Sequence, residues 1–277
     1  MMEAYSVLMS VYCKEQAAHF QAAIDSMLHQ TVPPVDFVIV CDGPLTPELD
    51  NVIADYCEAH PSLFQILRLE KNQGLGPALK IGLDACQCEY VARMDTDDIS
   101  LPDRMEKQLA ALRQSPHVSA VGGQIAEFDN SPDNIVDYRI VPESYEEIQS
   151  RAAKRNPMNH VTVVFKKSQV QKVGSYCDIP GFEDYHLWVQ MLAAGQQLIN
   201  IGDVCCYVRV DTHMYGRRGG WTYFKYTVEM ERFLMKTGFI NALGFFRNVM
   251  VRFFGTVVCP NSLRSFLFQK CMRQKQL

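Results

Sequence analysis

The sequence predicts an α/β fold whose sheet is parallel in its first part. Short apolar runs alternate with amphipathic helices through the first third of the chain, which is the pattern of parallel α/β proteins. Polar residues follow the ends of these runs, and ligands bind at that edge in such sheets. A composition of 48% hydrophobic and 21% charged residues over 277 positions indicates a substantial core and excludes a disordered chain.

Three apolar runs in this first part predict strands over Tyr5–Tyr12, Phe37–Cys41 and Phe64–Leu69. Helices are predicted between them over Gln16–Gln30 and Pro47–His60, because apolar residues recur there at helical spacing. Since each helix returns the chain across the sheet, the carboxyl ends of the strands are expected at one edge.

A glycine-containing turn, Asn72–Pro77, follows the third strand and leads into a helix predicted over Ala78–Cys86. The free N–H groups at the start of a helix favour an anion, such as a diphosphate. A plain strand-to-helix turn explains the same residues without a ligand, and it is the preferred explanation of this piece taken alone.

The stretch Glu89–Asp98, E-Y-V-A-R-M-D-T-D-D, begins as a buried strand and ends in three carboxylates. If extended backbone continues through them, Asp95 and Asp97 project to the same side, about 7 Å apart. Such a pair suits Mg²⁺ or Mn²⁺, which one or two carboxylates hold together with substrate phosphates. An acidic turn with Asp98 or Ser100 as the N-cap of the next helix is the alternative.

Helices and strands continue to alternate in the middle of the chain. Helices are predicted over Pro102–Gln114 and Tyr145–Ala153, and strands over Val118–Phe128, Tyr138–Val141, Val161–Lys166 and Val204–Val210. The strand over Tyr138–Val141 is expected to be antiparallel.

Another helix is predicted within Gly181–Gly195, with Glu183 and Asp184 at its first turn. The helix dipole favours carboxylates there, which is a complete structural explanation of both residues. Their position after a glycine-containing loop also allows one of them to act as a general base.

The loop Asp211–Gly220 combines His213, Arg217 and Arg218 with several glycines. These side chains could close over a metal-bound diphosphate, because arginine makes bidentate phosphate contacts and histidine binds metals. A solvated linker is an equally good explanation.

Charge divides the chain into an acidic body and a basic tail. Residues 1–213 carry 16 Lys and Arg against 29 Asp and Glu, a net charge of -13, whereas residues 214–277 carry 11 against 2, a net charge of +9. Such a tail favours an anionic partner, either nucleic acid or an acidic membrane surface. Nucleic acid is disfavoured, because the aromatic residues of the tail lie on an apolar helix face and not among the basic residues.

The tail is predicted to contain helices over Thr222–Lys236, Phe239–Val257 and Asn261–Arg273. The second of them is amphipathic. Arg247 and Arg252 make it too costly as a membrane span, whereas a basic helix with a Phe-rich face suits a membrane interface. Packing of that face on the body, or on a second copy of the chain in a homo-oligomer, is the alternative.

Ten cysteines are scattered along the chain, and the nearest pairs, Cys86/Cys88 and Cys205/Cys206, lack the spacing of a zinc site. Reduced thiols of a cytoplasmic protein are therefore expected. The segment Met1–Tyr12 does not have the pattern of a signal peptide.

In their order and spacing, these motifs resemble glycosyltransferase family two, the inverting enzymes with the GT-A fold, a Rossmann-like mixed α/β sheet flanked by helices. The residues that carry the resemblance are Ser10-Val11-Tyr12, Asp42-Gly43, Asn72-Gln73-Gly74, Asp95-Thr96-Asp97-Asp98 and Glu183-Asp184. The segment R-V-D-T-H-M-Y-G-R-R-G-G resembles a bacterial subgroup, of the amylovoran glycosyltransferase type, that builds capsules, exopolysaccharides and O-antigens.

The resemblance implies a UDP-sugar site. The residues implied to bind the nucleotide sugar are Val11, Tyr12, Asp42, Asn72, Gly74, Asp95, Arg217 and Arg218. Among these, Asp42 would contact uracil, and the two arginines would hold the leaving diphosphate. The chain has Cys41-Asp42-Gly43-Pro44 where the family commonly has D-D-G-S, so the nucleotide contact rests on a single carboxylate.

The resemblance also implies a divalent cofactor, Mn²⁺ or Mg²⁺. Asp97 would bind this cation, Asp95 would meet the ribose or the metal-bound diphosphate, and His213 would be a further ligand.

For the chemistry, the resemblance implies that Asp184 takes the proton of the acceptor hydroxyl, with Glu183 beside it contacting the acceptor. Inversion would turn an α-linked donor into a β-linkage. Galactose is the first expectation for the sugar, before glucose or N-acetylglucosamine. The acceptor would be a saccharide on a polyprenyl diphosphate, and the enzyme would be cytoplasmic and peripheral at the inner face of the cytoplasmic membrane.

The expected organisation is a GT-A catalytic domain over residues 1–213, with a nucleotide-binding half at 1–100 and an acceptor half at 101–213. A loop and helical tail follow at 214–277. A sugar nucleotidylyltransferase is disfavoured, because Ser10–Glu15 lacks the glycine-rich loop that holds a triphosphate. A non-catalytic nucleotide-sugar-binding or membrane-assembly protein on the same fold is the alternative function, and the intact carboxylate motifs disfavour it.

Overall fold

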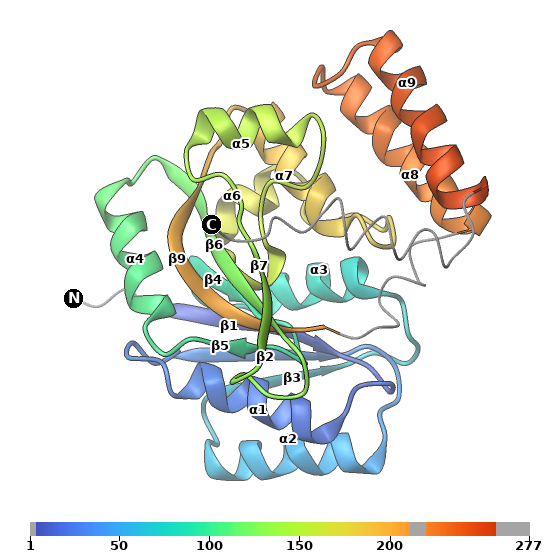
Figure 1. The fold of residues 1–277 in the computed structure, drawn as a ribbon. Coiled ribbons are helices and arrows are strands. Elements are labelled where there is room, and N and C mark those ends of the chain that lie inside the picture. Colours follow the sequence, from blue (N-terminus) through green and yellow to red (C-terminus); the bar gives the residue numbers. More distant parts are fainter. Residues whose placement is uncertain (1–3, 211–219, 259–277) are drawn as a thin grey trace.

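The computed structural model describes residues 4–210 and 220–258, whose strands form one mixed sheet of nine strands. The strands are β1 (Tyr5–Val11), β2 (Asp36–Cys41), β3 (Phe64–Arg68), β4 (Tyr90–Arg93), β5 (Ile99–Ser100), β6 (Val118–Phe128), β7 (Ile135–Arg139), β8 (Val164–Lys166) and β9 (Gln197–Arg209). Their order is β3-β2-β1-β4-β8-β6-β9-β5, and β7 pairs with β6 (Figure 1).

Helices cover both faces of this sheet. They are α1 (Ala17–Leu28), α2 (Pro47–Ala59), α3 (Leu75–Ala85), α4 (Arg104–Gln114), α5 (Tyr145–Ala152), α6 (Lys167–Lys172), α7 (Glu183–Ala193), α8 (Gly220–Lys236) and α9 (Ala242–Phe253), with a 3-10 turn at His160–Thr162 and a π-helical turn at Phe254–Val258. Thr46 and Ser144 cap α2 and α5 by accepting N–H groups of the first turn.

The predicted parallel pattern is confirmed for the first four strands of the sheet. β1 pairs in parallel with β2 and β4, and β2 pairs in parallel with β3. β8 is antiparallel to β4 and β6, and β7 is antiparallel to β6, as predicted for that strand. Because β1 lies between β2 and β4, the strand order reverses there, which is the point where open α/β sheets bind ligands.

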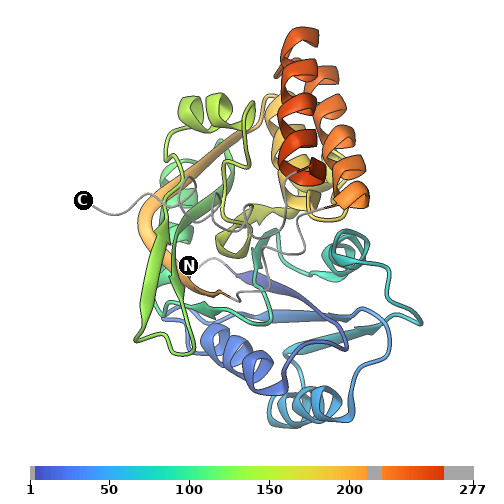
Figure 2. The same ribbon diagram turned by 45° about the vertical axis from the view of Figure 1, so that its right-hand side comes forward.

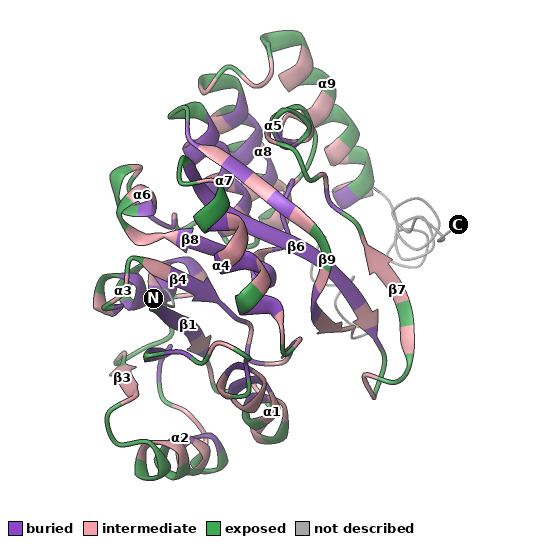
Figure 3. Cartoon of the chain, turned by 90° about the vertical axis from the view of Figure 1, so that its left-hand side faces the viewer, coloured by how far each residue is buried: buried purple, intermediate pink, exposed green. Residues whose placement is uncertain are grey.

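Alternating residues of the central strands build two cores. Tyr5, Val7 and Met9 of β1 face the core formed with α1, α2 and α4, whereas Leu8 faces the core formed with α3, α7 and α8. The buried residues of β6 run along most of its length, and Figure 3 shows this strand as a largely buried ribbon. The sheet is therefore apolar on both faces at its centre, as parallel sheets are.

Several element boundaries differ from the predictions; β7, for example, begins at Ile135 and not at Tyr138, and three other differences have a clear local cause. β9 begins at Gln197 and not at Val204, because Gly202 and Asp203 form an irregularity in its pairing with β6 and do not end the strand. α3 begins at Leu75, since Pro77 lies in the first turn, where no N–H is needed for the helix. α9 begins at Ala242 because the side chain of Asn241 caps it, accepting the N–H of Gly244 at 2.8 Å.

α8 and α9 form a helical hairpin on the side of the molecule away from α1 and α2 (Figures 1 and 2). α8 packs on α7 through stacked rings of His186 and Phe233, with 3.8 Å between their centroids, and through the buried side chains of Met230 and Leu234. Within the described residues, no helix is both long enough and apolar enough to cross a membrane. The predicted helix Asn261–Arg273 lies outside the described residues.

Candidate active site

The carboxyl ends of β1, β2 and β4 meet at one edge of the sheet, as the strand pattern predicted. The N–H of Asp42 donates to the carbonyl of Val11 at 2.8 Å, and the N–H of Met94 donates to that of Leu8 at 3.2 Å. The side chain of Val11 is fully buried in the core, whereas that of Tyr12 is partly exposed. Backbone hydrogen bonds therefore place the ends of β2 and β4 on either side of β1.

Asp42 holds the turn before α3. Its carboxylate accepts the N–H groups of Gln73 at 2.7 Å and Gly74 at 3.0 Å, and its carbonyl accepts Nδ2 of Asn72 at 3.2 Å. Gly43 has a φ of 87°, and a Cβ there would lie 2.7 Å from the backbone nitrogen of Asn72. The turn before α3, which was predicted to bind a diphosphate, is thus hydrogen-bonded to Asp42, the residue that was predicted to contact uracil.

The acidic turn lies beyond the end of β4. The strand stops at Arg93, so the expectation that Asp95 and Asp97 share one side of an extended strand does not hold. The next short strand, β5, pairs with β9 at the other end of the same sheet, so the acidic turn lies where the chain crosses from β4 to β5. The carboxylate of Asp95 is 35% exposed and forms an ion pair with Nη2 of Arg93 at 2.5 Å.

The other two carboxylates of this turn are more enclosed. Burial and the neighbouring Asp95 raise the pKa of Asp97 to about 7. Asp98 is buried, and its Oδ1 accepts the N–H of Arg209 at 2.8 Å. Burial, followed by the charges of Asp97 and Asp95, raises the pKa of Asp98 well above its ordinary value. Asp98 therefore fastens the turn to the end of β9 and does not cap α4, which begins at Arg104.

The donor set fits a divalent cation. Asp95 and Asp97 supply hard oxygen ligands, and their mutual repulsion is the kind that a cation relieves. Within the described residues, no cluster of three or more His, Cys, Asp or Glu side chains has metal-binding geometry. Two carboxylates completed by substrate phosphates are nevertheless a usual site for Mg²⁺. The third predicted ligand, His213, lies outside the described residues, as do Arg217 and Arg218.

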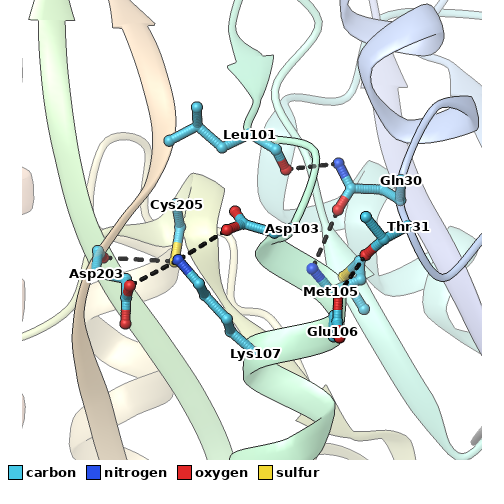
Figure 4. Close-up of polar contacts among 9 residues, drawn as sticks. All are labelled: Gln30, Thr31, Leu101, Asp103, Met105, Glu106, Lys107, Asp203 and Cys205. Atoms are coloured by element: carbon cyan, nitrogen blue, oxygen red, sulfur yellow. Dashed lines mark hydrogen bonds and ion pairs between the residues drawn. The ribbon is translucent and has the colours of Figure 1, made fainter.

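Polar contacts anchor the segment that follows the acidic turn (Figure 4). Gln30, beyond the end of α1, donates to the carbonyl of Leu101 at 2.8 Å and accepts the N–H of Met105 at 3.0 Å. Lys107 of α4 forms ion pairs with Asp103 at 2.8 Å and with Asp203 of β9 at 2.7 Å. Within the acidic turn itself, the hydroxyl of Thr96 donates to the carboxylate of Glu15 at 2.8 Å. The acidic turn and the segment that follows it are thus both held in place.

Glu183 and Asp184 begin α7, as predicted. Glu183 is buried, and burial raises its pKa to about 7. Asp184 is partly exposed; its Oδ2 accepts Nδ2 of Asn156 at 2.5 Å, and its Oδ1 accepts the N–H of Tyr185 at 2.7 Å. Burial raises the pKa of Asp184, while the hydrogen bond from Asn156 opposes that rise.

Gly76 brings this helix start close to the nucleotide side of the sheet. A Cβ at Gly76 would lie 2.0 Å from the carbonyl oxygen of Cys177 and 3.0 Å from Cγ of Glu183. Only glycine allows α3 to approach the loop before α7 this closely. Gly76 therefore lets the start of α3, which follows the turn Asn72–Gly74, pack against the start of α7 at Glu183.

Three residues at this site were not selected from the sequence. Arg93 is a buried arginine paired with Asp95, and Asn156 holds Asp184. His160 is hydrogen-bonded through Nε2 to the hydroxyl of Tyr176 at 3.0 Å, and burial, followed by the charge of Arg93, lowers its pKa well below the ordinary value. For Asn156 and His160 the available sequence signal is the run Asn156–His160, N-P-M-N-H, which interrupts the apolar pattern before the predicted strand Val161–Lys166.

A protein-family model described as Glycosyl transferase family 2 matches residues 6–173. An uncharacterized glycosyltransferase of Haemophilus influenzae is 38% identical to this chain, with 98% of this chain and 99% of that protein covered. The amylovoran biosynthesis glycosyltransferase AmsE of Erwinia amylovora is 37% identical, with 96% and 98% covered. A UDP-Gal:alpha-D-GlcNAc-diphosphoundecaprenol beta-1,3-galactosyltransferase of Escherichia coli is 32% identical, with 98% and 97% covered.

Solved structures share the fold at low sequence identity. The mannosyltransferase PcManGT of Pyrobaculum calidifontis, in complex with GDP-Man and Mn²⁺, matches with a TM-score of 0.66 at 16% identity, covering 100% of this chain and 77% of that one. S. aureus TarS 1-349, in complex with UDP-GlcNAc, matches with a TM-score of 0.66 at 15% identity, covering 97% and 76%.

Proposed function

This chain belongs to glycosyl transferase family 2 and has the predicted GT-A fold, and we propose that it moves a hexose from a UDP-sugar to a lipid-linked saccharide with inversion. The proposal is supported by two observations: Asp42 and Asp95–Asp97 follow the carboxyl ends of β2 and β4, the two neighbours of β1, and Gly76 lets the start of α3 pack against the start of α7, where Glu183 and Asp184 lie.

On the donor side, the nucleotide would lie over the ends of β1 and β2. Asp42 and the turn Asn72–Gly74 form one hydrogen-bonded unit beside the start of α3, whose N–H groups favour a diphosphate. Asp95 and Asp97 would hold Mn²⁺ or Mg²⁺ together with that diphosphate. When bound, the cation would offset the negative charge that develops on the departing UDP.

On the acceptor side, Asp184 is the proposed general base. An acceptor hydroxyl would attack the anomeric carbon from the face opposite UDP and pass its proton to the carboxylate of Asp184. The hydrogen bond from Asn156 holds that carboxylate in place and favours its ionised form. Glu183, which is buried behind Asp184, would support the acceptor side of the site.

The choice of galactose and of a lipid-linked acceptor draws on the relatives. The Escherichia coli protein that is 32% identical over nearly its whole length is named for transfer of galactose from UDP-Gal to a GlcNAc-diphosphoundecaprenol. A diphospholipid acceptor requires the enzyme to work at a membrane surface. The protein would therefore be cytoplasmic and bind the inner face of the cytoplasmic membrane.

The packing of α9 supports this membrane contact. Asn248 of α9 donates to Glu231 of α8 at 3.0 Å, and Arg252 lies 3.9 Å from the same carboxylate, so polar residues of α9 face the protein. Leu243, Phe246 and Met250 of α9 are 78%, 66% and 53% exposed. Figure 3 shows α9 as largely exposed and intermediate along its length. An apolar stripe that faces outward, within a basic tail, fits an anionic lipid surface.

A donor screen tests the enzymatic proposal. Purified full-length protein is incubated with Mn²⁺ and a panel of UDP- and GDP-sugars, with and without EDTA, and release of the nucleoside diphosphate is measured. Release from one UDP-sugar that EDTA abolishes is the expected result. Neither release nor metal-dependent nucleotide binding would favour the non-catalytic alternative on the same fold.

A further inference from the structure

Arg93 is a buried charge at the centre of the site, and the proposed reaction does not yet use it. It is the last residue of β4; its N–H donates to the carbonyl of Val163 at 2.9 Å, and its own carbonyl accepts Nη2 of Arg104 at 2.9 Å. Its side chain is 1% exposed. Because strand residues alternate, it lies on the same face of β4 as Val91, which packs in the core with α3 and α7.

The side chain of Arg93 has one charged partner and two unused donors. Nη2 pairs with Oδ1 of Asp95 at 2.5 Å, whereas Nε and Nη1 are buried and have no hydrogen-bond partner among the described residues. Burial raises the pKa of Asp97 on the donor side and of Asp184 on the acceptor side, and the charge of Arg93 opposes both rises. Arg93 is thus a cation shared by the two acidic halves of the site.

Stability does not explain this arrangement. A buried donor without a partner is destabilising, and buried ion pairs are often no better for stability than apolar residues of similar size. The partner of Arg93 is not buried with it, since a third of the Asp95 side chain is exposed.

We infer that Arg93 is a positioning residue for the donor site: its guanidinium, fixed inside the protein, holds the Asp95 carboxylate where the nucleotide diphosphate and its cation are bound. This inference rests on the proposed function. Arg93 itself would not touch the substrate, because its side chain is enclosed. Its contribution would act through Asp95 and would be lost when Asp95 is lost.

A double-mutant cycle tests this. Binding of UDP in the presence of Mn²⁺ is measured by titration calorimetry for the wild-type chain, Arg93→Met, Asp95→Asn and the double variant. Arg93→Met is expected to weaken UDP binding about ten-fold, and the same change in the Asp95→Asn background by less than about two-fold. Arg93→Lys, which keeps the charge without the planar fork, is expected to fall between wild type and Arg93→Met.

Stability measurements separate positioning from damage to the fold. Thermal unfolding is measured for every variant, because Arg93→Met leaves Asp95 without its buried cation and is expected to lower the melting temperature; if this variant does not fold, Arg93→Lys takes its place in the cycle. Arg113→Met, on the exposed last turn of α4, is the matched control and is expected to bind UDP like the wild type. Additive effects of Arg93→Met and Asp95→Asn would overturn the inference. A wild-type chain that binds no UDP and releases none from any UDP-sugar would instead remove the proposed function.

Discussion

Nδ2 of Asn156 donates a hydrogen bond to Oδ2 of Asp184 over 2.5 Å, joining the segment after α5 to the first turn of α7. If Asp184 is the base, Asn156→Ala should lower kcat about ten-fold, because one hydrogen bond to a charged group is lost. Burial already raises the pKa of Asp184, and Asn156, Arg139 and Arg93 oppose that rise. Without Asn156 the acid limb of the kcat profile should therefore move to higher pH. If the acid limb of the kcat profile lay at the same pH in Asn156→Ala and in the wild type, this prediction would be wrong.

Replacement of the base itself should separate binding from chemistry. Asp184→Asn keeps the size and much of the hydrogen bonding of the side chain but does not accept a proton from the acceptor. Transfer should fall at least about 100-fold, in the range typical of a lost general base, while Mn²⁺-dependent UDP binding stays unchanged. Steady-state kinetics and calorimetry on the same preparation give both values. Near-full transfer by this variant would show that another group is the base.

Glu183 should make the stability of the protein depend on pH. Burial raises its pKa to about 7 in the folded state, above the ordinary value of 4.5, so the folded state binds a proton more tightly than the unfolded state. Its contribution to stability is therefore largest below about pH 4.5 and is lost as the pH rises through about 7. Glu183→Gln should be more stable than wild type at pH 8, with a smaller difference at pH 5. Urea unfolding at both pH values measures this difference, and an equal effect at both would contradict it.

Gly76→Ala should disturb the site, and Gly82→Ala in the same helix is its control. A Cβ at Gly76 meets the backbone carbonyl of Cys177 at 2.0 Å, whereas a Cβ at Gly82 meets the side chains of Leu8 and Val40 at 2.5 and 2.6 Å. Both changes should lower the free energy of unfolding by about 1–3 kcal/mol through overpacking. Only Gly76→Ala should also weaken Mn²⁺-dependent UDP binding, because it displaces the start of α3. Equal UDP affinities in the two variants would count against this link.

The exposed face of α9 should determine membrane binding. Changing Leu243, Phe246 and Met250 together to Ser should abolish co-sedimentation with vesicles that contain anionic phospholipid, because the apolar area available for insertion is lost. Val35, another exposed apolar residue, provides a control in Val35→Ser, which should bind vesicles like the wild type. A wild-type chain that ignores vesicles but sediments as a dimer, and a triple variant that becomes monomeric, would assign this face to a second copy instead.

The alternation of helices and strands, and the places where polar residues interrupt it, could be predicted from local sequence patterns. β6 has the predicted bounds Val118–Phe128, and Glu183 and Asp184 lie at the start of a helix as the local pattern required. These features depend on hydrophobic periodicity and on turn residues, which act between near neighbours in the chain. Local patterns alone therefore predicted that the carboxyl ends of the strands lie at one edge of the sheet.

The contacts between charged groups, in contrast, depend on how the elements pack in three dimensions. Arg93 was one residue in an apolar run, and Asn156 was part of a chain break, until packing brought them to Asp95 and Asp184. The outward direction of the apolar stripe on α9 likewise depends on the docking of Asn248 and Arg252 on Glu231. Asn156 and Asp184, like Asn248 and Glu231, are far apart in sequence, whereas Arg93 and Asp95 are near neighbours that pair where β4 ends. The free energy that selects these contacts comes from burial and electrostatics, which local periodicity does not contain.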